Sequence, residues 1–216
     1  MKLYGYWRSS AAYRVRIALN LKQLSAEHIS VHLVNNGGEQ HSASFHQLNP
    51  QHLVPAFVDS GEQGELTLSQ SLAIIEYLED KYPDHRLLPS NIEDRAIVRS
   101  MAQAIACEIH PLDNLRVLQY LVNEMGVSEA DKMRWYHHWI HVGFAALEVQ
   151  LGQYSGRFCF GDTPSLADIC LIPQVYNAKR FNLELAAYPN IVRIWHECQQ
   201  LSAFADAAPE QQHDAS

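Results

Sequence analysis

The sequence predicts an α/β domain followed by an all-helical domain, which together make an α/β plus all-α fold. Strand patterns and a hairpin signal occur only in the first 82 residues, where they alternate with helix patterns. From about residue 90 onward every periodic segment is helical. A short polar linker between Pro83 and Pro89 separates the two regions. We therefore predict one domain over residues 1–83 and a second over residues 90–216.

Three elements open the first domain. Residues 2–7 form a short segment rich in aromatic side chains, which favours a strand. Residues 11–21 carry apolar side chains four positions apart, which predicts a helix. Residues 28–34 alternate between apolar and polar side chains, as in a strand that is buried on one face.

A hairpin and a second helix complete the first domain. The strands of the hairpin are expected at residues 56–59 and 66–68, with glycines in the turn between them. Residues 69–71 supply capping side chains for a helix that Pro83 stops. The order of elements is therefore βαβ, a long connection and ββα.

Capping signals and prolines define the helices of the second domain. Ser90 with Glu93, and Ser165 with Asp168, have the spacing of capping boxes, and Ser128 with Asp131 starts a further helix. We expect Pro173 to kink the helix that begins at Ser165. The expected helices span residues 90–108, 112–122, 128–151, 165–180 and 189–200.

The composition is that of a globular protein, with 47% hydrophobic and 19% charged residues among 216. A net charge of -8 argues against nucleic-acid binding, which needs a basic surface. We expect no membrane contact, because no apolar run reaches spanning length and no signal peptide precedes the first strand. The four cysteines lie mostly in apolar stretches, which fits buried thiols in a cytoplasmic protein. Only residues 207–216 suggest disorder, since they lack apolar periodicity.

The segment from Arg8 to Ala12 lies between the first strand and the first helix. The start of a helix offers unpaired N–H groups and a positive dipole end, which stabilise an anion such as a thiolate. Ser9 or Ser10 could add a hydroxyl hydrogen bond. From this segment alone, a plain N-cap is the favoured interpretation.

Two further segments of the first domain could bind a peptide-like ligand. If the Val54-Pro55 bond is cis, the backbone of Val54 turns outward, although only about 5% of X-Pro bonds are cis. Gln70 and Ser71 open the second helix, where N–H groups and a hydroxyl suit a carboxylate. Plain capping is again the favoured local interpretation.

The second domain offers polar groups at a helix break and at a helix end. His110, Asn114 and Arg116 surround the break at Pro111, where a solvated bend is the favoured interpretation. Arg180 either complements a helix dipole or clamps a carboxylate.

No metal site is expected. His137 and His141 have metal-ligand spacing, but no third ligand accompanies them, so we interpret them as part of a solvated helix face. Glycine-rich nucleotide motifs and the Gly-x-Ser-x-Gly hydrolase motif are absent as well.

Taken together, these segments resemble the zeta class of glutathione transferases. Residues 8–19 resemble the arginine-rich signature of the class, and residues 48–55 resemble the turn of its glutathione domain. The sequence pattern of the family is also closely matched by residues 70–78, 161–168 and 173–181. The similarity extends over nearly the whole chain.

The resemblance implies a thioredoxin-like N-terminal domain, an all-helical glutathione-transferase C-terminal domain, a homodimer and a cis Val54-Pro55 bond. It implies the cofactor glutathione, held by Ser9, Ser10, Ala11, Ala12, Tyr13, Arg14, Gln40, Val54, Gln70 and Ser71. The residues that reach in from the helical domain would be His110, Asn114, Leu115 and Arg116. The chemistry of the class is the isomerisation of maleylacetoacetate or maleylpyruvate, so a small anionic maleyl substrate is expected.

The chain departs from the family pattern at three places. Ala11 stands where the usual cysteine follows the serine pair. His110 stands where many relatives carry glutamine, and this resembles bacterial maleylpyruvate isomerases. Residues 62–65 lengthen the hairpin, which we expect to be a surface variation.

The resulting hypothesis is an isomerase in which the chain activates the glutathione thiol. Ser9, or failing that Ser10, lowers the pKa of the thiol, so that the thiolate adds reversibly to the maleyl double bond. Arg8 and Arg180 are the candidates for holding the substrate carboxylate or enolate. The alternatives are a general glutathione-conjugating transferase and a non-catalytic binding module of the same fold.

Overall fold

The computed structural model describes residues 1–215, which form two compact units. The first unit contains Met1–Leu87 together with the C-terminal segment from Gln200 onward, and the second contains Leu88–Gln199. This division differs from the expected domains in one respect. The sequence assigned the C-terminal segment to the helical domain, whereas in the structure it packs with the first unit. The reason is a set of hydrogen bonds to the first helix, described below.

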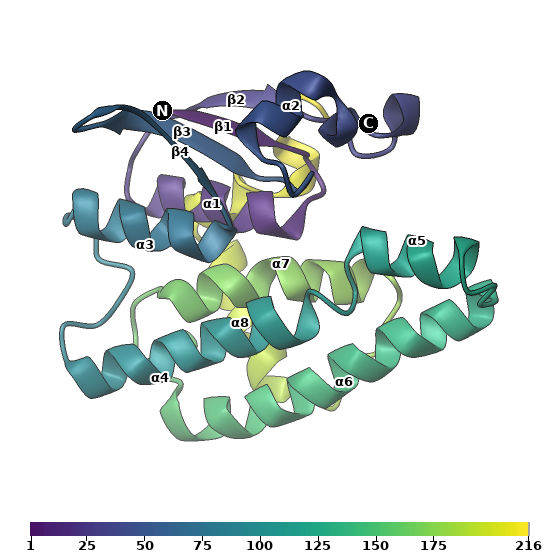
Figure 1. The fold of residues 1–216 in the computed structure, drawn as a ribbon. Helices are drawn as coiled ribbons and strands as arrows, with labels where there is room; N and C mark the ends of the chain where they lie inside the picture. Colours follow the sequence, from purple (N-terminus) through teal and green to yellow (C-terminus); the bar gives the residue numbers. More distant parts are fainter. Residues whose placement is uncertain (216) are drawn as a thin grey trace. The chain divides into compact units, whose positions relative to one another are not determined.

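The first unit is built on a four-stranded sheet with the order β2-β1-β3-β4 (Figure 1). The β1 strand pairs with β2 in parallel and with β3 in antiparallel orientation, and β3 and β4 form the expected hairpin. The exposed residues 62–65 lie at the turn of that hairpin. The strands span Lys2–Gly5 (β1), Glu27–Ser30 (β2), Ala56–Gly61 (β3) and Gly64–Ser69 (β4). The β2 strand is thus shorter than the 28–34 predicted.

Helices cover both faces of this sheet. The α1 and α3 helices pack against each other on one face, and α2 packs on the other through Phe45 (Figure 1). Phe45 shares a core cluster with Val31 and Ala56. The helical elements of this part of the chain are α1 (Ser10–Leu21), η1 (Asn35–Gly37), η2 (Glu39–His41), α2 (Ala43–Leu48) and α3 (Ser71–Lys81).

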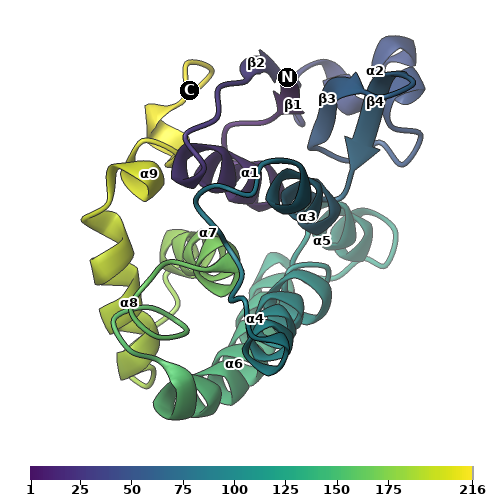
Figure 2. The ribbon, with the colours of Figure 1, turned by 90° about the vertical axis from the view of Figure 1, so that its left-hand side faces the viewer.

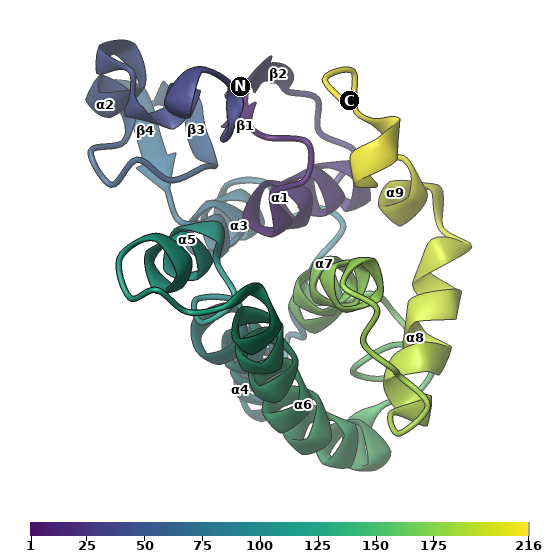
Figure 3. The ribbon, with the colours of Figure 1, turned by 90° about the vertical axis from the view of Figure 1, so that its right-hand side faces the viewer.

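The C-terminal segment is ordered, contrary to the prediction for residues 207–216. The short helices α9 (Ser202–Ala205) and η4 (Pro209–Gln211) form there, and Ala207 is 1% exposed. Both side views place α9 next to α1 (Figure 2, Figure 3). The predicted disorder was wrong for residues 207–215, because their order depends on tertiary hydrogen bonds rather than on apolar periodicity; the prediction for Ser216 lies outside the described residues.

The second unit is entirely helical in its regular structure, with α7 at its centre. Nearly all of α7 is buried, including the continuous run from Leu166 to Val175, and α7 packs against α4 and α8 (Figure 3). Its elements are α4 (Ile92–Gln103), the π-helical turn η3 (Ala104–Ile109), α5 (Leu115–Asn123), α6 (Glu129–Tyr154), α7 (Leu166–Arg180) and α8 (Pro189–Gln199).

The predicted helix starts are mostly confirmed. Ser128 caps α6, and Ser165 forms a capping box with Asp168 at the start of α7. Asn91 rather than Ser90 caps α4, because its Oδ1 accepts hydrogen bonds from the first-turn N–H groups. Pro173 lies inside α7, which runs unbroken from Leu166 to Arg180. None of the helices in the described part of the chain is long and apolar enough to cross a membrane.

Candidate functional site

The N-terminus of α1 carries the two candidate serines. Ser9 is the N-cap, and its Oγ accepts a hydrogen bond from the N–H of Ala12 at 3.2 Å. The capping role therefore falls to Ser9. Because a hydroxyl that accepts one hydrogen bond still has a proton to donate, Ser9 can cap the helix and also donate to an anion. Ser10 is the first residue of the helix and is 4% exposed.

Arg8 is held next to this helix start by two aromatic rings. Its Nη2 and Nε donate to the hydroxyl of Tyr6 at 2.9 and 3.2 Å. Its guanidinium carbon lies 4.4 Å from the centroid of the Trp7 ring, which is cation–π distance. These contacts use two of the five guanidinium N–H donors, so a positive group with donors to spare is fixed immediately before the serine pair.

Gln70 and Ser71 form the start of α3. Gln70 has φ 71, in the left-handed region that is costly for a residue with a Cβ. Its side chain makes no capping bond, so the interpretation as a plain cap was wrong; its Nε2 donates instead to Oε1 of Gln51 at 2.9 Å. A strained residue at a helix start, whose N–H groups suit a carboxylate, points to ligand binding.

Arg14 supports this second helix start from behind. Its Nη1 donates to the hydroxyl oxygen of Ser71 at 3.3 Å, and the side chain is among the largest fully buried ones in the described chain. A buried guanidinium is costly unless it is hydrogen-bonded. The bond therefore connects the middle of α1 to the first residue of α3, where a ligand carboxylate would lie.

Gln40 lies in η2 and Val54 in the loop before β3, and the sequence interpretation missed two residues near them, Gln51 and His52. The ring Nδ1 of His52 lies 2.8 Å from the carbonyl oxygen of Gln40. Val54-Pro55 is cis, which confirms the expectation from the family resemblance. His52, with φ 55, and Gln51 carry no motif that could have marked them; their roles depend on partners at least 12 residues away.

In the second unit, the helix break is ordered by its own polar groups. Asn114 caps α5 by accepting from the N–H of Arg116 at 3.2 Å, and its Nδ2 lies 3.3 Å from Nε2 of His110. Leu115 and Arg116 are exposed. The bend is thus not merely solvated, because His110 and Asn114 orient each other.

Arg180 lies at the end of α7 with an exposed side chain, 4.8 Å from the ring centroid of Phe181. Two buried groups that the sequence interpretation missed accompany it. Asp113 is 8% exposed, and burial raises the pKa of its carboxyl group to about 8. Burial first, and the charge of Asp113 second, raise the pKa of Tyr136, whereas the charge of Arg180 opposes this shift. The charges of Asp113 and Arg180 therefore act in opposite directions on the Tyr136 hydroxyl.

The interpretation of a solvated histidine face on α6 fits His141, which is exposed, but not His137, which is partly buried. Nε2 of His137 lies 2.9 Å from the carbonyl oxygen of Phe181, and Nδ1 of His141 lies 2.7 Å from the hydroxyl of Tyr188. Both rings therefore connect α6 to neighbouring segments of the same unit. Among residues 1–215, no three His, Cys, Asp or Glu side chains are grouped so as to hold a metal ion.

Family models match both units of the chain. The N-terminal domain of glutathione S-transferases matches residues 3–86, and the C-terminal domain of the same family matches residues 140–206. The chain is also 45% identical to a solved maleylpyruvate isomerase in its holo form, described as a bacterial glutathione S-transferase of the zeta class. The two match over 100% of both chains with a TM-score of 0.94.

The chain belongs to the zeta class of glutathione S-transferases.

Two further relatives resemble this zeta-class transferase over its whole length. A probable maleylacetoacetate isomerase of Vibrio cholerae is 55% identical over 213 residues, which is 99% of this chain and 97% of that protein. The crystal structure of a maleylacetoacetate isomerase from Methylobacterium extorquens with bound malonate and glutathione is 41% identical, with a TM-score of 0.93 and 100% coverage of both chains. The predicted fold class, a thioredoxin-like domain with a helical transferase domain, is confirmed.

Proposed function

We propose that this zeta-class transferase is a glutathione-dependent cis-trans isomerase of a small maleyl acid, either maleylacetoacetate or maleylpyruvate. The observation that carries the proposal is the start of α1, where the Ser9 hydroxyl and a positioned Arg8 accompany a helix N-terminus. The names of the full-length relatives, one for each substrate, support the same reaction class.

The residues of the first unit fit glutathione at two helix starts. Ser9 and the α1 N-terminus suit the sulfur, because a helix dipole and a hydroxyl donor both favour thiolate over thiol. Gln70 and Ser71 suit a carboxylate of the tripeptide, and Arg14 holds Ser71 in place. The solved maleylacetoacetate isomerase with bound glutathione, 41% identical to this chain, supports glutathione as the cofactor.

When bound, glutathione supplies a thiolate that adds to the cis double bond and leaves again after rotation, so that the tripeptide is not consumed. The chain supplies the charges that this reaction requires. Arg8 is proposed to stabilise negative charge that develops on the substrate, since its guanidinium is already oriented by Tyr6 and Trp7. Arg180, with an exposed guanidinium, is proposed to bind a substrate carboxylate.

The protein is also proposed to be a cytoplasmic homodimer. None of the four cysteines forms a disulfide, and Cys159, Cys170 and Cys198 are buried, which supports a reducing compartment. The dimer rests on the family resemblance. Sedimentation equilibrium tests it, with an expected mass of twice the 24.5 kDa of one chain.

Absorbance-followed turnover of both maleyl substrates with substoichiometric glutathione tests the activity. We expect complete conversion of one substrate to its trans isomer with the glutathione thiol recovered in full. Replacing Ser9 with alanine should lower kcat by about 10²-fold or more, as the loss of a positioned hydrogen-bond donor does elsewhere. Glutathione consumed in proportion to product would instead indicate a conjugating transferase, and absence of glutathione binding would indicate a non-catalytic module.

A further inference from the structure

Arg16 connects the C-terminal segment of the chain to the residue that precedes Arg8. Its Nη2 donates to the carbonyl oxygen of Trp7 at 2.9 Å, and its Nε donates to the carbonyl oxygen of Ala207 at 3.0 Å. Arg16 is 4% exposed, Trp7 7% and Ala207 1%. One buried guanidinium therefore binds two backbone groups that are 200 positions apart in the sequence.

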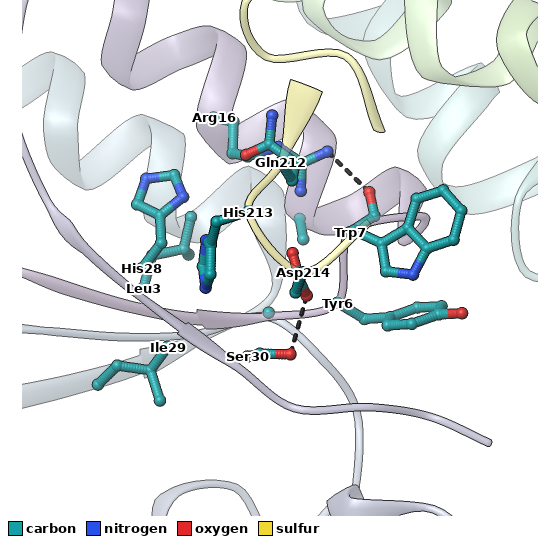
Figure 4. A pocket seen from close by; sticks show the side chains of 12 residues that line it. Leu3, Tyr6, Trp7, Arg16, His28, Ile29, Ser30, Gln212, His213 and Asp214 are labelled. Atoms are coloured by element: carbon teal, nitrogen blue, oxygen red, sulfur yellow. Dashed lines mark hydrogen bonds between the residues drawn. The ribbon is translucent and has the colours of Figure 1, made fainter. Parts of the chain in front are cut away.

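The C-terminal segment is fixed on α1 at further points. The hydroxyl of Tyr13 donates to the carbonyl oxygen of Phe204 at 3.4 Å, and Nδ2 of Asn20 donates to that of Ala203 at 3.0 Å. Farther along, the hydroxyl of Ser30 donates to the carboxylate of Asp214 at 2.8 Å (Figure 4). Side chains of α1 thus hold the segment mainly by its backbone carbonyls.

Apolar packing alone does not connect the segment to Trp7. A small hollow of about 20 Å³ is lined by Tyr6, Trp7 and Arg16 together with residues 212–214 (Figure 4). Beside this hollow, the two hydrogen bonds of Arg16 connect the segment to the Trp7 carbonyl.

The position of Trp7 affects the proposed glutathione site directly. Its ring is the surface on which the Arg8 guanidinium lies, and its carbonyl belongs to the peptide group that leads into Arg8. The N–H of Ser9 in turn donates to the carbonyl of Tyr6 at 2.9 Å. Fixing the Trp7 carbonyl therefore fixes the turn that presents Arg8 and Ser9.

We propose that Arg16 is a positioning residue of the glutathione site. In this proposal the C-terminal segment from Gln200 onward holds Arg16 in the conformation that orients the Trp7–Ser9 turn. The inference rests on the proposed function, because it assigns that turn to the glutathione sulfur. The segment acts through Arg16 without contacting the cofactor. A residue of this kind should alter the ionisation of bound glutathione and kcat more than it alters glutathione affinity.

The test compares Arg16→Gln with Asn20→Ala. Both changes remove a bond from α1 to the C-terminal segment, but only Arg16→Gln also releases the Trp7 carbonyl, because Asn20 is exposed near the other end of the helix. The readouts are the ultraviolet absorbance of the thiolate of bound glutathione against pH, kcat for the maleyl substrate, and KM for glutathione and for the maleyl substrate.

We expect Arg16→Gln to move the thiol titration to higher pH and to lower kcat by about tenfold to a hundredfold, as displacement of a reacting group by roughly 1 Å does. KM for glutathione should change less than kcat, and Asn20→Ala should match the wild type in both readouts. An unshifted titration curve for folded Arg16→Gln that binds glutathione would overturn the proposal. So would an equal shift in Asn20→Ala, since Asn20 makes no bond to the Trp7 carbonyl and the effect would then not depend on Arg16.

If Arg16→Gln does not fold, Arg16→Lys provides the test, because an ammonium lacks the planar fork that reaches two carbonyls at once. It should show a smaller shift of the same sign, and a wild-type titration curve would contradict the proposal. The thiol titration needs glutathione but no maleyl substrate. A wild-type protein that ionises glutathione without isomerising either substrate would therefore refute the proposed function and leave this inference testable by its own readout.

Discussion

Replacing Asp168 with alanine should destabilise the second unit strongly. The carboxylate is 0% exposed and accepts three hydrogen bonds, each at 2.8 Å. They come from the N–H of Cys159 and from the N–H and hydroxyl of Ser165. Alanine leaves both N–H groups buried without an acceptor, whereas the hydroxyl can rotate toward another partner.

The magnitude follows from these unpaired groups. An orphaned buried donor costs about 1–3 kcal/mol, so two donors cost roughly 2–6 kcal/mol. Removing Asp168 also removes the cost of burying a charged carboxylate, which is the reason why the pKa of this group lies above its usual value of 3.8. We therefore expect a loss of about 3 kcal/mol, in the lower half of the range. For a chain of this length that corresponds to a fall of about 6–12 °C in Tm.

Asp131 offers a matched control in the same unit. It occupies the corresponding position at the start of α6, where its N–H donates to the hydroxyl oxygen of Ser128 at 3.1 Å. Its carboxylate accepts a hydrogen bond from the Ser128 hydroxyl at 2.8 Å, but the side chain is 45% exposed, so water replaces this bond in Asp131→Ala. The expected cost is about 0.5–1 kcal/mol. Thermal and urea unfolding of both variants check the comparison, and equal losses for Asp168→Ala and Asp131→Ala would refute the reasoning.

Three further predictions concern single groups. Burial raises the pKa of Asp59, but hydrogen bonds from Lys81 and Tyr77 outweigh it, so the folded-state pKa lies below 3.8. The contribution of Asp59 to the free energy of unfolding is fully present above the unfolded-state pKa and is lost as pH falls through the folded-state pKa. Asp59→Asn should therefore be less stable than the wild type near neutrality and similar to it in strong acid. Urea unfolding at a series of pH values checks this. For Asp113, burial raises the folded-state pKa from 3.8 to about 8. The wild type should therefore lose stability relative to Asp113→Asn as pH rises between these values. Parallel curves of unfolding free energy against pH for the two proteins would contradict this. Ser71→Ala should raise the Kd for glutathione about tenfold by calorimetry, since it removes a hydroxyl bonded to a charged donor, with Ser69→Ala unchanged as the control.

Helix starts were predictable where the cap is local. Ser128 and Ser165 were found from spacing alone, because a capping bond joins residues two or three positions apart and so leaves a short pattern. Gln70 shows the limit of this reasoning. The pattern predicted a plain cap, but the side chain contacts Gln51, 19 positions earlier in the chain. A local pattern carries no information on such a partner.

The C-terminal segment was mispredicted for a related reason. Its order depends on the carbonyl oxygens of Ala203, Phe204 and Ala207, which accept hydrogen bonds from side chains of α1. Every residue has a carbonyl, so the accepting side of these bonds has no signature in the sequence. Only the donors, at the other end of the chain, are distinctive.

Hydrogen bonds also explain how the first helix can contain two arginines that are almost fully buried. Arg14 and Arg16 are 2% and 4% exposed, and burial of a guanidinium is unfavourable unless its donors are satisfied. Two positions apart on a helix, they point to different sides: Arg14 donates to Ser71 at the start of α3, and Arg16 donates to Trp7 and Ala207. The helix that would face the glutathione sulfur at its N-terminus is thus also the element that fixes both the carboxylate-binding helix start and the Trp7–Ser9 turn. A substitution at either arginine should therefore perturb the ligand site through its supports, even though both side chains are buried.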